Sequence, residues 1–151
     1  MSTQGTQIAH TGIITRDAVK LAQFYIDGLG FHQVRADMGS LRPDSSGTLE
    51  VAQVQMRVIS LSLGGEGSHI LEFTQYLEPV GPDQHQVRNG IGSAHLAIYV
   101  ENVVESFEVL QRLGAIVGSK PIVTATGGRF GFLRDPEGNW LELMQHPKSE
   151  S

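Results

Sequence analysis

The sequence contains no cysteine among its 151 residues. Disulfide bridges, thiolate metal sites and a cysteine nucleophile are therefore excluded. If this protein binds a metal ion, nitrogen and oxygen atoms must supply the ligands.

Clusters of basic residues and long apolar runs are also missing. The 11 basic residues stand against 16 acidic residues, a formal net charge of -5, and no group of Lys or Arg forms a patch for phosphates. No stretch approaches the roughly 20 apolar residues that span a bilayer. The first residues, 1–7, are polar and lack the apolar centre of a signal peptide. We therefore expect a cytoplasmic protein that binds neither nucleic acid nor a membrane.

Hydrophobic residues are plentiful enough for a folded core, at 40% of the chain against 18% charged residues. The length suits one ordinary domain, or two half-sized units that share a core. We expect a single domain over residues 1–151, in which a connection rich in Gly, Pro and polar residues, at about 77–92, joins two modules at about 8–76 and 93–146.

The first module follows the order strand, helix and three strands. Asp17 is placed to cap the start of the helix, and Gly28 and Gly30 are placed to end it. The predicted strands lie at 8–15, 31–38, 51–63 and 69–76.

The second module repeats this order. Asn102 and Glu105 have the spacing of a capping box at the helix start, and Gly114 supplies the stop. The predicted strands lie at 93–100, 115–123, 129–134 and 140–145. The fold class is therefore α+β, with two tandem βαβββ modules.

Spacing along the chain supports a repeat. His10 precedes Gly30 by 20 residues, and His95 precedes Gly114 by 19. From that glycine to the glutamate of the last strand, the first module has 42 residues and the second has 28, a difference of 14. We place most of the extra residues in a long hairpin loop at 39–48.

Each module puts one histidine on its first strand and one glutamate on its last strand: His10 and Glu72, then His95 and Glu142. Alternate strand residues share a face, so all four side chains are predicted on the face away from the helices. A carboxylate in an apolar strand is costly to bury without a partner, and a divalent cation would satisfy both carboxylates. The competing interpretation is four unrelated, solvated side chains. Their repetition in both modules favours a metal site.

These features resemble the vicinal-oxygen-chelate superfamily, which includes glyoxalase I, bleomycin resistance proteins and extradiol dioxygenases. The resemblance rests on the tandem βαβββ order, the repeated His and Glu, and the turn Arg-Asp-Pro-Glu-Gly-Asn at 134–139, and it spans about residues 8–146. It implies curled mixed sheets that enclose a metal-centred cavity. His10, Glu72, His95 and Glu142 would bind one nickel, cobalt, zinc, manganese or iron(II) ion.

The resemblance further implies a lyase or isomerase of the glyoxalase I type that acts on a small substrate with adjacent oxygens. Such an enzyme abstracts a proton next to a metal-chelated carbonyl, through an enediolate, and Glu72 and Glu142 are the candidate bases. A homodimer is expected, with the site formed within one chain or across the dimer. The alternatives are a methylmalonyl-CoA epimerase-like enzyme, an extradiol-type dioxygenase and a non-catalytic drug-binding resistance protein.

Two features of the sequence favour different enzyme classes, the glyoxalase I type and the epimerase-like type. The turn at 134–139 is similar to that of glyoxalase, whereas the long connection from Glu72 to His95 is closer to that of an epimerase. Trp140 is expected in the core, although it shares the face of Glu142. Five arginines are candidates for binding a carboxylate or phosphate of the substrate, with none preferred: Arg16, Arg35, Arg88, Arg129 and Arg134.

Overall fold

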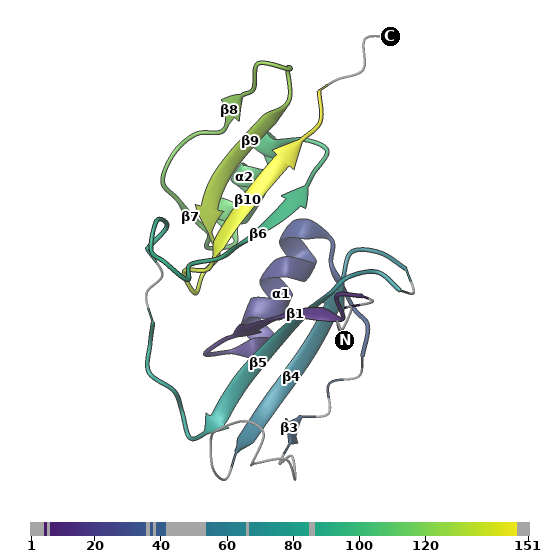
Figure 1. Ribbon diagram of the computed structural model, residues 1–151, viewed down its shortest axis with the longest axis vertical. Coiled ribbons are helices and arrows are strands. Elements are labelled where there is room, and N and C mark those ends of the chain that lie inside the picture. The colour runs from purple at the N-terminus through teal and green to yellow at the C-terminus, as the bar shows by residue number, and fades with distance from the viewer. Residues whose placement is uncertain are drawn as a thin grey trace, which may run out of the picture. The chain divides into compact units, whose positions relative to one another are not determined.

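The protein forms two compact units, Met1–Pro82 and Asp83–Ser151. The computed structural model describes residues 5, 7–35, 37, 39–41, 54–65, 67–84 and 87–147 (Figure 1). The boundary between the units falls inside the predicted connection at 77–92.

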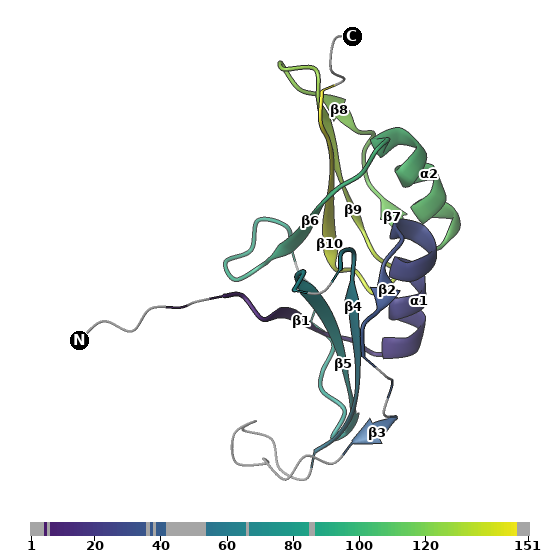
Figure 2. The same ribbon diagram turned by 90° about the vertical axis from the view of Figure 1, so that its right-hand side faces the viewer.

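Unit 1 is a mixed sheet with one helix on one face (Figures 1 and 2). Strand β1 is parallel to β5, β4 is antiparallel to β5, and β2 and β3 both pair with β4. The elements are β1 (His10–Ile14), α1 (Ala18–Leu29), β2 (His32–Gln33), β3 (Ser40–Leu41), β4 (Gln55–Ser62) and β5 (Ile70–Glu78).

Unit 2 repeats this topology. Strand β6 is parallel to β10, β9 is antiparallel to β10, and β7 and β8 both pair with β9. The elements are β6 (His95–Tyr99), α2 (Val103–Arg112), β7 (Ile116–Val117), β8 (Ile122–Val123), β9 (Arg129–Arg134) and β10 (Trp140–Gln145). The predicted α+β class and tandem modules are confirmed.

Both helices begin at the predicted residues. The Asp17 carboxylate accepts a hydrogen bond from the Lys20 backbone N–H at 3.1 Å, and the Asn102 side chain accepts from the N–H groups of the first turn of α2. Helix α1 ends at Gly30, whose φ of 72° is the left-handed conformation of a helix stop. The prediction that Gly28 also ends this helix is wrong, because a helix interior tolerates a glycine at a cost of only about 1 kcal/mol.

Two predicted strands differ most from those in the structure. Within its described residues, the strand expected at 31–38 is limited to β2, and the strand expected at 115–123 divides into β7 and β8. Gly118 and Pro121 lie between those two pieces, and proline lacks the N–H that a continuous ladder requires. The hairpin loop predicted at 39–48 is wrong at residues 40–41, which form strand β3 because they pair with β4, and residues 42–48 lie outside the described part of the chain.

The core of each unit lies between its helix and the helix-facing side of its sheet. In unit 1, Leu71 and Phe73 are buried, and the Phe73 ring lies 5.0 Å from that of Tyr25. In unit 2, Leu141 and Leu143 are fully buried. Because these residues alternate with Glu72 and Glu142, the glutamates lie on the opposite faces of their sheets. Among the described residues, no helix is long and apolar enough to cross a membrane.

Candidate metal centre

Unit 1 brings the predicted histidine and glutamate together on one face of its sheet. In the parallel pair of β1 and β5, His10 lies opposite Ile70, and Gly12 lies opposite Glu72. The histidine and the glutamate are therefore offset by two residues across neighbouring strands. His10 Nε2 lies 3.8 Å from Glu72 Oε1.

Unit 2 has the same arrangement in the same register. His95 lies opposite Trp140, Ala97 lies opposite Glu142, and His95 Nε2 lies 3.2 Å from Glu142 Oε2. The histidine side chains are 47% and 49% exposed in the two units and the glutamates 17% and 18%, so the pairs match in exposure as well. Each unit presents one imidazole and one carboxylate at the surface of its sheet.

The surroundings of the two carboxylates differ. On the strand next to Glu72, the facing residue is Ser60, whose hydroxyl donates a hydrogen bond to Glu72 Oε2 at 3.5 Å. Arg35 Nη1 lies 3.8 Å from the same oxygen. The residue that faces Glu142 is Phe132, whose ring meets the His95 ring edge to face, with 5.5 Å between centroids.

The chemistry and spacing of these donors fit a divalent metal ion. Imidazole nitrogen and carboxylate oxygen each bond such an ion at about 2.0–2.2 Å, so two neighbouring ligands lie about 3 Å apart. The 3.2 Å between His95 Nε2 and Glu142 Oε2 is close to this value, and the 3.8 Å between His10 Nε2 and Glu72 Oε1 exceeds it by less than 1 Å. No group of three or more His, Asp or Glu suited to a metal occurs among the described residues. The residues described in one unit thus offer two donors.

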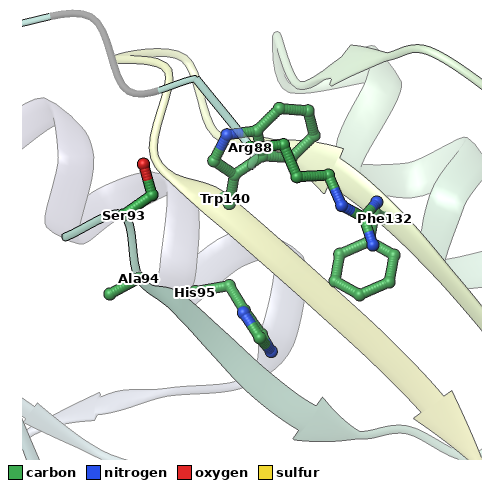
Figure 3. A pocket seen from close by; sticks show the side chains of 6 residues that line it. All are labelled: Arg88, Ser93, Ala94, His95, Phe132 and Trp140. Carbon is green, nitrogen blue, oxygen red and sulfur yellow. The ribbon is translucent and has the colours of Figure 1, made fainter. Parts of the chain in front are cut away.

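Next to His95, unit 2 contains a hollow of about 250 Å³ (Figure 3). The Arg88 guanidinium carbon lies 3.3 Å from the centroid of the Phe132 ring and 5.7 Å from that of Trp140. The lining residues are Arg88, Ser93, Ala94, His95, Phe132 and Trp140.

Sequence reasoning missed this hollow. The sequence places Trp140 on the same face as Glu142, which indicated a position near the site, but we predicted that it packs in the core. Arg88 stands in the irregular connection, where no strand or helix pattern predicts the direction of a side chain. Phe132 lies on β9 directly opposite Glu142, a relationship that follows from strand register.

Two other histidines are exposed and have partners. His69 Nε2 is 2.8 Å from the Thr11 hydroxyl, and the His146 ring stacks on Tyr99 with 4.0 Å between centroids. Neither is part of the pairs described above. His32 is exposed, and His85 lies outside the described residues.

The turn at 134–139 is stabilised by a buried carboxylate. Asp135 is fully buried and accepts hydrogen bonds from the backbone N–H groups of Glu137 and Asn139 at 2.9 and 3.0 Å, and from Asn139 Nδ2 at 2.8 Å. This part of the sequence motif therefore shapes the turn before β10, the strand that carries Glu142.

The chain belongs to the Glyoxalase/Bleomycin resistance protein/Dioxygenase superfamily, whose family model matches residues 7–143. The match confirms the resemblance inferred from the sequence. A comparison with curated proteins found no match.

Solved structures show the same fold. A glyoxalase family protein from Bacillus cereus is 15% identical with a TM-score of 0.82, and the match covers 96% of this chain and 97% of that one. The trypanothione-dependent glyoxalase I of Leishmania major is 22% identical with a TM-score of 0.66, over 93% and 87% of the two chains. A glyoxalase-related enzyme from Fulvimarina pelagi is 19% identical with a TM-score of 0.59, over 93% and 88%.

Proposed function

We propose that the two His–Glu pairs together bind one divalent metal ion, and that the protein is a lyase or isomerase of the glyoxalase I type. The observation that carries this proposal is the repetition of one His–Glu geometry, with the same register and nearly the same exposure, in both units. The substrate would be a small molecule with adjacent oxygens. A homodimer and a cytoplasmic location stay predictions.

The donor set suits this chemistry. When bound, the metal would act as a Lewis acid that polarises a substrate carbonyl and so acidifies the neighbouring C–H group. His10 and His95 would serve as neutral imidazole ligands. Glu72 and Glu142 would serve as ligands and as the groups that accept the proton and return it to the adjacent carbon.

The protein's own contacts prepare Glu72 for this role. The Ser60 hydroxyl and the Arg35 guanidinium both approach Oε2, whereas Oε1 is the oxygen nearer to His10. One carboxylate oxygen is thus oriented by the protein while the other faces the histidine. Fixing a ligand in this way reduces the entropy lost on binding and holds the base in place.

A fourth protein ligand favours proton transfer over oxygen-dependent ring cleavage. Four protein ligands leave two positions of a six-coordinate ion, whereas a catechol and dioxygen together require three. Glu72 is therefore the residue on which the choice between these two reaction classes rests.

Metal content is the first test. Protein purified without a metal-binding tag, incubated with excess nickel, cobalt, zinc or manganese and desalted should retain one ion per chain by elemental analysis. His95→Ala and Glu142→Ala should abolish retention, and chelator should remove the ion. His146→Ala and Glu101→Gln are matched controls outside the pairs and should retain it. Absence of bound metal in the unmodified protein would refute the enzyme proposal and favour a drug-binding protein.

Solvent exchange tests the reaction class. In deuterated solvent without oxygen, the metal-loaded protein should exchange the proton on the hydroxyl-bearing carbon of an α-hydroxycarbonyl substrate. Glu72→Gln should reduce exchange sharply, because an amide cannot accept the proton. Activity that requires iron(II), consumes oxygen and survives this substitution would establish a dioxygenase instead.

A further inference from the structure

The hollow beside His95 contains one cationic side chain, that of Arg88, among its lining residues. Within the described part of the chain, Arg88 forms no ion pair with a carboxylate, although acidic residues outnumber basic ones in the sequence. At 3.3 Å from the Phe132 centroid, the guanidinium lies against the face of that ring (Figure 3). Stacking of this kind engages the flat face of the guanidinium and leaves its in-plane N–H groups available to an acceptor.

The loop that carries Arg88 is held in place by its own hydrogen bonds. The Val87 carbonyl accepts from the Gly90 N–H at 2.8 Å and from the Ser93 hydroxyl at 2.6 Å, and the Ser93 N–H donates to the Gly90 carbonyl at 3.0 Å. Arg88 therefore extends from a closed turn, and its backbone position is defined before any ligand binds.

The aromatic side chains around Arg88 are particular to unit 2. Phe132 takes the register position that Ser60 occupies opposite the glutamate of unit 1, and Trp140 takes the position that Ile70 occupies opposite the histidine. Unit 1 thus has a hydroxyl and an aliphatic side chain where unit 2 has two aromatic rings. The two rings give unit 2 flat surfaces beside its His–Glu pair.

We propose that this hollow is the substrate-binding subsite for an aromatic carboxylate, with the carboxylate on Arg88 and the ring against Trp140. The charge fits, because a single guanidinium balances a carboxylate monoanion and can bind it through two N–H groups. The size also fits one ring, since about 250 Å³ lies just below the roughly 300–1,000 Å³ of drug-sized pockets. That the bound aromatic carboxylate is the substrate rests on the proposed function. That the hollow binds an aromatic carboxylate does not depend on it.

Trp140 is the only tryptophan of the chain, so its fluorescence reports on this hollow alone. We expect benzoate to change the fluorescence of chelator-treated protein saturably. Benzamide, the neutral analogue, and acetate, which lacks the ring, should each bind about tenfold more weakly or worse, because each loses one of the two interactions. Equal affinity for benzamide, tighter binding of phenyl phosphate, or no saturable change with benzoate would overturn the proposal.

Variants locate the interaction. Arg88→Gln should weaken benzoate binding about tenfold or more, and Arg88→Lys should restore part of it, since the lysine keeps the charge and loses the flat fork. Arg134→Gln is the matched control, because Arg134 lies 5.5 Å from the Trp140 ring without lining the hollow. Loss of binding in Arg134→Gln with none in Arg88→Gln would overturn the assignment.

Because benzoate binding is measured on chelator-treated protein, this test is independent of the proposed metal site. Benzoate binding that depends on Arg88, in a protein that takes up no metal, would support the subsite and refute the enzyme proposal. Metal uptake without Arg88-dependent benzoate binding would refute the subsite and support the metal site of the proposed function.

Discussion

Ser60 and Phe132 occupy equivalent positions in the two units, each directly opposite the glutamate of its own unit on the neighbouring antiparallel strand. The serine donates a hydrogen bond to Glu72, whereas the phenylalanine contacts the His95 ring and carries Arg88 on its face. The two units therefore share one His–Glu geometry and differ in what surrounds it. Unit 1 orients its carboxylate, and unit 2 forms an aromatic wall.

Removing the serine hydroxyl tests whether it orients the carboxylate. Ser60→Ala should weaken metal affinity about tenfold, the lower end of the roughly 10- to 100-fold range for partners of metal ligands, because the 3.5 Å hydrogen bond is long. Isothermal titration with the ion that gives full occupancy measures the change.

Ser62→Ala is the matched control for this substitution. Ser62 is also buried on β4, but its hydroxyl donates to the His69 carbonyl at 3.1 Å. This change should lower the free energy of unfolding by about 1 kcal/mol and leave metal affinity unaltered. An equal loss of affinity in both variants would mean that a general disturbance of β4, and not the Glu72 contact, is responsible.

Asp135 should contribute to stability and not to metal binding. Asp135→Ala leaves three donors without their acceptor, so we expect the free energy of unfolding to fall by about 2–4 kcal/mol. Urea denaturation measures this loss. Glu108→Gln, an exposed substitution on α2, should change stability by less than about 0.5 kcal/mol. A stable Asp135→Ala protein that binds no metal would contradict a purely structural role.

The charge on the cap of α1 gives a pH-dependent contribution to stability. The Lys20 backbone N–H, which donates to the Asp17 carboxylate, lowers the pKa of Asp17 below its usual 3.8. A lowered folded-state pKa stabilises the fold above the unfolded pKa, and the stabilisation disappears as pH falls through the folded value. The stability of the unmodified protein relative to Asp17→Asn should therefore be constant between about pH 5 and 7 and decline below about pH 4.

Urea denaturation across this range measures the effect, with Asp17→Ala as the companion variant. Asparagine keeps the hydrogen-bond acceptor, whereas alanine removes the cap and should cost about 1 kcal/mol at pH 7. If the relative stability of the unmodified protein increased on acidification, the charged cap could not be its source.

Periodic patterns predicted the parts of the fold that regular packing determines. Strands β9 and β10 begin and end at the predicted residues, because their alternating buried and half-buried side chains form a clear pattern. The predictions were poorer for β2, β7 and β8, short edge strands whose extent depends on hydrogen bonds to a neighbour and not on their own sequence. The end of α1 was wrongly predicted at Gly28, because a glycine ends a helix only where the backbone adopts a positive φ, as it does at Gly30.

The candidate site divides in the same way. Strand alternation predicted that each histidine and glutamate share a face, and the structure confirms this within each unit. Their assembly into one metal site stays a prediction. The position of Arg88 could not be predicted from the sequence. It depends on a turn closed by the Ser93 hydroxyl, and a loop of this kind has no periodic pattern.

The offset between histidine and glutamate is set by one parallel strand pair in each unit, with His10 opposite Ile70 and His95 opposite Trp140. It is the same in both units, although 42 residues separate the helix-ending glycine from the glutamate in one and 28 in the other. Insertions and deletions in the intervening loops therefore leave the His–Glu spacing intact. A repeated scaffold of this kind lets evolution change loop lengths and the residues around each pair while the His–Glu geometry is inherited unchanged.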